Sequence, residues 1–241
     1  MQQLPLGITL KPGVNFEHFV PGSNIQALAS IQSCLLKHEN PFIFLWGGIS
    51  TGKSHLLQAA CHQADALGLQ VAYIPLLQLH SFSAAMLEGL DQFDLICLDD
   101  VEQVAGLKEW EQALFNLFNN LRASNARLLV TANCSPTALK FDLPDLISRL
   151  SWGLNYRLHP LSENETVEAL LKAAVERGLK MPEESARYLL KHCPRDMGSL
   201  LDILDQLDRA SLAAQRRLTI PFVRSQLESE LIAARRLHTQ T

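Results

Sequence analysis

The sequence of 241 residues predicts an α/β fold, a parallel sheet flanked by helices, followed by a small all-helical domain. Three observations lead to this prediction. Short, continuous apolar runs alternate with segments of helical periodicity, a glycine-rich loop joins the first run to a helix, and no comparable run follows Pro160. We therefore expect a flexible tail over residues 1–15, the α/β domain over 16–160 and the helical domain over 161–241.

Four strands are expected in the α/β domain, because four short apolar runs are bounded by turn residues or charges. They cover residues 42–46, 71–76, 95–98 and 127–131. Unbroken apolar runs are typical of parallel strands that are buried on both faces. Apolar residues three and four positions apart predict helices before and between these runs. The helices cover residues 24–38, 53–67, about 84–90 and 110–121.

The helical domain is predicted from its end signals. Ser162 and Glu165 match a capping box, and Gly178 is placed to end the helix that follows. Pro182 opens a second helix, and residues 195–214 carry leucines at helical spacing. Since no strand follows, we expect these helices to pack against one another as a bundle.

Composition excludes several classes of protein. Hydrophobic residues make up 47% of the chain, enough for a core without disulfides or metal. The five cysteines are scattered singly, without a CxxC pair or zinc-ligand spacing, as expected in a reducing cytoplasm. A net charge of -4 gives no positive field to gather DNA. With neither a basic leader nor a run of about 18 apolar residues, we expect a cytoplasmic protein, without membrane attachment or direct sequence-specific DNA binding.

A phosphate-loop pattern, GxxxxGKS, is satisfied by GGISTGKS, which follows an apolar strand and opens a helix. Glycines let backbone N–H groups turn towards phosphates, and the helix N-terminus and Lys53 supply positive charge. The Ser54 hydroxyl can bind Mg²⁺. A glycine-rich turn without a ligand is the alternative, and the flanking strand and helix argue against it. The candidate nucleotide-contacting residues are Gly47, Gly48, Ser50, Thr51, Gly52, Lys53, Ser54 and His55.

A second half of this site is expected where another parallel strand ends. The run LICLDD ends in Asp99, which can face a metal bound at Ser54, and in Asp100, which can orient or deprotonate water. An acidic pair after a strand is often only solvated charge, but here it follows a phosphate loop. Together the two motifs predict nucleotide binding, and they do not decide whether the nucleotide is hydrolysed.

The order of these motifs resembles that of AAA+ proteins of the DnaA group, and in particular its Hda-type regulators. The likeness covers most of the chain and is carried by FEHFVPGSN, the phosphate loop, LDD, LLVTAN, LPDLISRL, PRDMGSLL and AQRRLTIPFV. It implies a P-loop AAA+ fold with a helical lid, and bound ADP, ATP or another nucleotide with Mg²⁺. It also implies that Phe19 and Asn24 lie against the base and ribose, and that Arg195 of the lid contacts phosphates of the same nucleotide.

Two further residues are assigned roles by the resemblance. Asn133, with Thr131 as a second candidate, stands where the family senses the terminal phosphate; by spacing alone, a turn residue fits equally well. Arg149 in LISRL matches the arginine that family members extend into a neighbour's nucleotide, where it stabilises charge on the γ-phosphate. The alternative for Arg149 is a helix-terminal arginine that binds carbonyl oxygens.

The resemblance also implies partners. The tail residues Gln3, Leu4, Pro5 and Leu6 are similar to the end of a peptide that binds the DNA polymerase sliding clamp (beta subunit), and an extended apolar tail suits such docking. A tail without a partner is the alternative. The sequence ends soon after RLTIPFV, which favours an Hda-type regulator over an initiator with a C-terminal helix-turn-helix. DnaA is then the expected partner, and contact at the nucleotide makes a homodimer a further expectation.

Two hypotheses for function follow. In the first, the ADP-bound protein on the clamp presents Arg149 to ATP held by DnaA, stimulates its hydrolysis and so inhibits replication initiation. In the second, it is a self-sufficient AAA+ ATPase, such as a helicase loader, or a small-molecule phosphotransferase. Asp100 is shorter than the glutamate common at its position, which predicts at most weak intrinsic ATPase activity and favours the first hypothesis.

Overall fold

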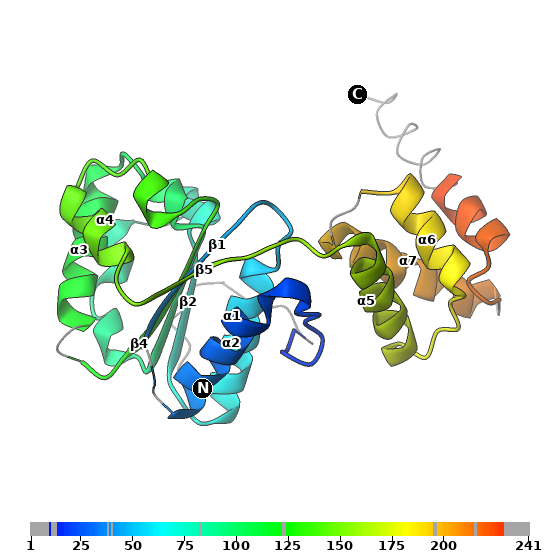
Figure 1. The fold of residues 1–241 in the computed structure, drawn as a ribbon, viewed down its shortest axis with the longest axis horizontal. Coiled ribbons are helices and arrows are strands. Elements are labelled where there is room, and N and C mark those ends of the chain that lie inside the picture. Colours follow the sequence, from blue (N-terminus) through cyan, green and yellow to red (C-terminus); the bar gives the residue numbers. More distant parts are fainter. Residues whose placement is uncertain are drawn as a thin grey trace. The chain divides into compact units, whose positions relative to one another are not determined.

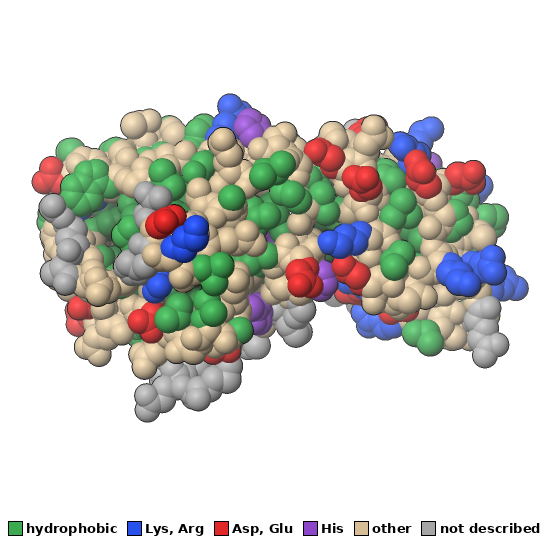
Figure 2. Space-filling view, turned by 60° about the horizontal axis from the view of Figure 1, so that its bottom comes forward, with side chains coloured by type: hydrophobic (Ala, Val, Ile, Leu, Met, Phe, Trp, Pro, Cys, Tyr) green, Lys and Arg blue, Asp and Glu red, His purple; other side chains and the backbone are tan. Residues whose placement is uncertain are grey.

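The computed structural model describes residues 10, 14–37, 39, 41–81, 83–121, 124–194, 197–214 and 216–228. The chain divides into two compact units, Met1–Pro160 and Leu161–Thr241, which are taken separately below (Figure 1). No helix in the described ranges is long and apolar enough to cross a membrane. On the face shown in Figure 2, basic and acidic side chains occur on both units, and no continuous basic field covers that face.

The first unit is built on a five-stranded parallel sheet in the order β2-β3-β4-β1-β5. Its strands are β1 (Phe42–Trp46), β2 (Val71–Pro75), β3 (Leu95–Asp99), β4 (Arg127–Ala132) and β5 (Leu154–Arg157). All residues of β3 are buried, as the unbroken apolar run predicts. The predicted α/β fold and its four predicted strands are confirmed.

Helices cover both faces of the sheet, α1 and α2 on one and α3 and α4 on the other (Figure 1). They are α1 (Ile25–Lys37), α2 (Lys53–Ala66), α3 (Lys108–Leu121) and α4 (Pro144–Leu150). Successive strand residues point to opposite faces, so Leu95 and Cys97 pack with α1 and α2, whereas Ile96 and Leu98 pack with α3 and α4. The core of this unit therefore consists of two apolar layers separated by the sheet.

The structure differs from the sequence predictions in two places. Strand β5 was not predicted, because this short edge strand alternates half-buried and exposed residues and has no apolar run. The prediction of a helix over about 84–90 is wrong. Two 3-10 turns, Ala84–Leu87 and Leu90–Gln92, stand there instead, because the backbone is extended at Glu88 and has a φ of 75° at Gly89. Other 3-10 turns cover Gly22–Asn24, Leu76–Ser81, Val101–Val104 and Pro136–Ala138.

The second unit is helical in its described residues. It contains α5 (Glu163–Glu176), α6 (Glu183–His192) and α7 (Met197–Ala214), and residues 220–228 are also helical. The predicted capping box is present: the Ser162 hydroxyl accepts from the Glu165 N–H, and the Glu165 carboxylate accepts from the Ser162 N–H. Leucines from all three helices, with Leu218 and Val223, form one buried cluster. This is the bundle that the leucine spacing predicted.

Candidate functional site

The candidate site lies at the carboxyl-terminal edge of the sheet. Because all strands are parallel, β1 leads into the phosphate loop at the same edge where β3 ends in Asp99 and β4 is followed by Asn133. These three strands are adjacent in the order β3-β4-β1. The fold thus gathers the groups that the sequence separates, at the edge where open α/β sheets bind ligands.

The phosphate loop holds its lysine in a fixed position. Lys53 is only 9% exposed, and its Nζ donates hydrogen bonds of 2.9 Å to the carbonyl oxygens of both Gly47 and Gly48. The Thr51 hydroxyl closes the loop by donating to the Gly48 carbonyl at 3.0 Å. Ser50 has a left-handed φ of 61°, a strained conformation that is concentrated at functional sites. The loop therefore keeps a positive charge where an anion can approach.

Two glycines of the loop are required by close contacts. A Cβ added at Gly47 would lie 2.6 Å from the carbonyl oxygen of Leu158, the residue directly after β5. At Gly52 the φ is 89°, and a Cβ would lie 2.7 Å from Cε2 of Phe19. Gly48, by contrast, is exposed and has open space at this position. The loop thus packs closely against the end of the β5 segment on one side and against the segment before α1 on the other.

Asp99 is buried at 3% exposure, and both of its carboxylate oxygens accept hydrogen bonds. The Thr131 hydroxyl donates to Oδ1 at 2.5 Å, and the Tyr73 hydroxyl donates to Oδ2 at 2.7 Å. Tyr73 accepts from Nε2 of Gln58 at 3.3 Å, and Thr131 accepts from the Asp100 N–H at 2.8 Å. A buried carboxylate is costly unless it is hydrogen-bonded in this way. Sequence reasoning missed Tyr73, a polar-tipped aromatic residue in a predicted strand.

Asp100 and Glu102 place two more carboxyl groups close to Asp99. Burial, together with the charges of Asp99 and Glu102, raises the pKa of Asp100 to about 6. Burial also raises the pKa of Glu102, whose carboxylate accepts from the Asn133 N–H. Its Oε2 is buried without a partner within the described part of the chain. Lys53 opposes both shifts. Sequence reasoning missed Glu102, although it stands only two positions after the acidic pair.

The oxygen donors at this edge suit Mg²⁺ in a nucleotide complex. Ser54 lies in the first turn of α2, and Asp99 lies at the end of β3. Mg²⁺ on a nucleotide takes most ligands from phosphate and water, so one or two protein oxygens suffice. Among the described residues, no group of three or more His, Cys, Asp or Glu could hold a metal. The site fits a metal that arrives with a nucleotide.

The segment before α1 packs against the phosphate-loop helix. The rings of Phe19 and His55 are 5.6 Å apart between centroids, and His55 Nε2 lies 2.9 Å from the Asn15 carbonyl oxygen. Burial lowers the pKa of His55. Asn24 donates to the carbonyl oxygen of His159 at 2.9 Å and accepts from its N–H at 2.8 Å. Contacts of Phe19, His55 and Asn24 with a nucleotide remain predictions.

Arg149 lies on α4, on the face of the sheet opposite to α2. It is half-buried, and its guanidinium carbon lies 4.7 Å from the centroid of the Phe115 ring on α3. Such stacking is a favourable cation–π contact. The structure therefore does not group Arg149 with the phosphate loop of its own chain.

The other predicted residues are exposed or lie outside the described ranges. Asn133 is exposed directly after β4, and its role towards a phosphate stays a prediction. The tail residues and the lid arginine fall outside the described residues; they are Gln3, Leu4, Pro5, Leu6 and Arg195.

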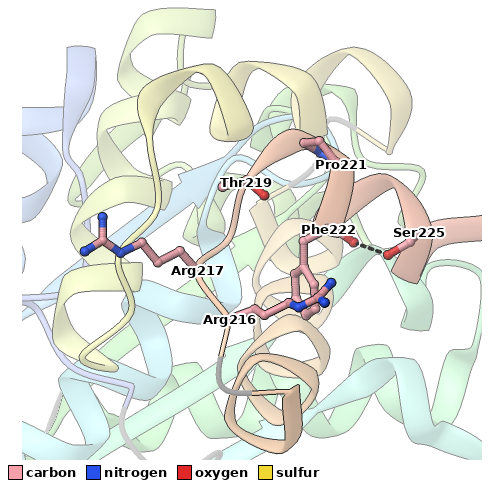
Figure 3. Close-up of a pocket in the computed structure, with 6 residues that line it drawn as sticks. All are labelled: Arg216, Arg217, Thr219, Pro221, Phe222 and Ser225. Carbon is pink, nitrogen blue, oxygen red and sulfur yellow. Dashed lines mark hydrogen bonds between the residues drawn. The ribbon is translucent and has the colours of Figure 1, made fainter.

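A separate depression of about 370 Å³ lies within the second unit (Figure 3). Its lining includes the buried Phe222 and two exposed arginines. The lining residues are Arg216, Arg217, Thr219, Pro221, Phe222 and Ser225. None of them belongs to the predicted phosphate site.

Comparison with known proteins agrees with the geometry at the sheet edge. Residues 10–157 match the family described as the bacterial DnaA ATPase domain, and residues 163–227 match the family described as the Hda lid domain. The chain belongs to the bacterial DnaA ATPase-domain family. It is an Hda-like, DnaA-homologous AAA+ protein, as its motif order indicated.

Solved structures share this AAA+ fold. Domain III of the replication initiation protein DnaA from Thermotoga maritima is 24% identical, with 92% of this chain and 98% of that chain covered and a TM-score of 0.78. AMPPCP-bound DnaA from Aquifex aeolicus is 22% identical, with coverage of 92% and 71% and a TM-score of 0.75. The RuvB Holliday junction branch migration motor of Thermotoga maritima is 16% identical, with coverage of 90% and 72% and a TM-score of 0.67.

Proposed function

We propose that this protein binds ADP with Mg²⁺ at its phosphate loop and inhibits replication initiation by stimulating hydrolysis of ATP held by DnaA. The observation that carries the proposal is the position of Arg149. Its helix, α4, lies across the sheet from α2, and so the guanidinium is separated from its own phosphate loop. An arginine placed there is available to a nucleotide held by a neighbouring AAA+ domain.

The nucleotide site supports the first half of the proposal. Lys53 is fixed inside the loop, and the Asp99 carboxylate accepts hydrogen bonds from two hydroxyl donors at the end of β3. The relative from Aquifex aeolicus has AMPPCP bound. Asn133 is the proposed sensor of the terminal phosphate, and Asp100 is the proposed water-orienting acid. Phe19 and Asn24 are proposed to line the base and ribose pocket.

The partners are proposed from the family and the tail. Edge-to-edge contact at the nucleotide, as the family resemblance implies, would place Arg149 against the γ-phosphate of the ATP held by DnaA. There the guanidinium would stabilise the charge that develops during hydrolysis. Residues Gln3 to Leu6 would hold the protein on the sliding clamp. The net charge of -4 supports recruitment by the clamp rather than by direct DNA binding. Contact between two copies through the same edge would give a homodimer.

The test mixes clamp loaded on DNA, ATP-bound DnaA and either wild type or Arg149→Ala. An arginine supplied in trans is worth about 10³–10⁵ in hydrolysis rate, so the variant should return hydrolysis to the level without added protein. Arg187→Ala is the control, because Arg187 is an exposed arginine paired with Glu183 at 2.8 Å in the second unit. Equal hydrolysis with wild type and Arg149→Ala would rule the proposal out.

A self-sufficient AAA+ ATPase is the second candidate, and Glu102 is the observation that favours it. Glu102 is longer than Asp100 and keeps an unpartnered carboxylate oxygen beside the site. Such a group could take the role of a base that orients water. Rapid, repeated turnover of ATP by the purified protein alone would support this candidate. Turnover that requires DnaA would support the regulator.

A further inference from the structure

We infer that Tyr73, on the neighbouring strand β2, is a positioning residue that aims the Asp99 carboxylate for Mg²⁺-dependent nucleotide binding. The inference rests on the proposed nucleotide site. The Tyr73 hydroxyl donates to Oδ2 of Asp99 at 2.7 Å, in a part of the protein where Asp99 is only 3% exposed. No sequence motif identifies Tyr73, because its contact depends on how β2 and β3 pair.

The strand register explains why a tyrosine occupies this position. Tyr73 stands opposite Cys97, two residues before Asp99 on β3. Two residues advance a strand by about 6.6 Å, a distance that the tyrosine ring spans and a short hydroxyl side chain does not. The residue directly opposite Asp99 is Pro75, which has neither an N–H nor a side-chain donor. Tyr73 therefore supplies the donor that β2 otherwise lacks at this point.

Two donors on opposite sides fix the orientation of the carboxylate. Tyr73 reaches Oδ2 from β2, and Thr131 reaches Oδ1 from β4 at 2.5 Å. The terminal torsion of an aspartate is broad, so one donor alone leaves the carboxylate plane poorly defined. Each carboxylate oxygen still has a second lone pair. Asp99 can therefore donate a lone pair to a metal, or accept a hydrogen bond from water on the metal, while both hydroxyls stay bonded.

Tyr73 also connects Asp99 to the helix behind the phosphate loop. Nε2 of Gln58 on α2 donates to the Tyr73 hydroxyl at 3.3 Å. Hydrogen-bond partners of a metal-side carboxylate typically change metal affinity by about 10–100-fold when removed. Loss of this hydroxyl should therefore affect the metal-dependent part of nucleotide affinity.

The test measures binding of fluorescently labelled ADP to the full chain, once in EDTA and once in saturating Mg²⁺. The ratio of the two dissociation constants is the Mg²⁺ gain. For Tyr73→Phe we expect unchanged affinity in EDTA and a Mg²⁺ gain about tenfold smaller than in wild type. Tyr156→Phe is the matched control, because it removes a hydroxyl bonded to Ser30 at 2.7 Å, on β5. Its Mg²⁺ gain should equal that of wild type.

A second pair of variants keeps the test decisive if Tyr73→Phe does not fold. Thr131→Val removes the other donor to Asp99, whereas Thr131→Ser keeps it. The first should lose Mg²⁺ gain at unchanged affinity in EDTA, and the second should retain both. A merely structural effect, through the Asp100 N–H bond that the Thr131 hydroxyl also accepts, would lower the affinity in EDTA as well. An undiminished gain in Tyr73→Phe, or in Thr131→Val where that pair is used, would overturn the inference and leave the nucleotide site intact. Absence of nucleotide binding by wild type would overturn the proposed function itself.

Discussion

Replacing Glu111 by alanine should destabilise the first unit strongly, because this carboxylate joins three backbone segments. Glu111 is 1% exposed on α3. Its Oε1 accepts from the N–H groups of Gly106 at 2.7 Å and Asp142 at 3.1 Å. Its Oε2 accepts from the N–H of Leu143 at 2.9 Å, at the residue that caps the start of α4. Glu111 thus fixes the helix that carries Arg149.

The size of the effect follows from the groups left without partners. A hydrogen bond to a charged group contributes about 1.5–3 kcal/mol net, and Glu111→Ala removes three acceptor contacts. The cost of burying the carboxylate offsets part of this sum, and breaking buried charged networks typically costs about 3–5 kcal/mol. We expect a loss in that range. Glu111→Gln keeps one acceptor oxygen and should lose about half as much.

Urea unfolding followed by tryptophan fluorescence reports on the first unit, which contains Glu111. All three tryptophans of the sequence lie there: Trp46, Trp110 and Trp152. Glu109→Ala is the matched control, because Glu109 is an exposed glutamate in the same helix. It should change the unfolding free energy by less than about 0.5 kcal/mol. A loss below about 1 kcal/mol for Glu111→Ala would refute the idea that Glu111 anchors α4.

Three further predictions concern the protein alone, measured with no nucleotide or metal added. The pKa of Asp100 is raised from 3.8 to about 6, so its ionisation costs stability as pH rises through this window. Asp100→Asn should therefore be more stable than wild type at pH 7.5, by about 1 kcal/mol after allowance for partial exposure, and should show no advantage at about pH 3, below both pKa values. Gly47→Ala should lose about 2 kcal/mol in the same assay, because its Cβ meets the Leu158 carbonyl at 2.6 Å. Asn24→Ala should speed hydrogen exchange of the His159 amide, which loses its 2.8 Å acceptor; unchanged protection would contradict this.

The strands could be predicted closely because burial on both faces leaves a plain sequence signal. Strand β3 reads LICLD and is buried throughout, and its predicted end differs from the structure by one residue. Strand β5 reads LNYR and lies at the sheet edge, where only alternate residues face the core. Such a short segment has the same composition as a loop. Its pairing with β1 supplies the strand character that its own residues do not.

The candidate site was predictable only where a local motif defines it. The phosphate loop and Asp99 could be recognised because glycines, lysine and an acid are needed at set places in the chain. Tyr73 could not be recognised, since its role arises from the register of two strands whose adjacency the sequence does not state. The same holds for Glu111, whose partners include Leu143 far along the chain. Buried polar contacts between distant segments are invisible to periodicity.

The sheet separates the two parts of the proposed mechanism, and this separation bears on regulation. Asp99 is held on the α2 side by hydroxyls, whereas Arg149 is placed on the α4 side by its stack on Phe115. Leu98 and Val130, which belong to the core on the α3 and α4 side of the sheet, are fully buried. A close-packed layer of this kind does not deform continuously. We therefore interpret Arg149 as preset in position. If the proposed function is correct, control then lies in bringing the protein beside its proposed partner, and not in moving the arginine.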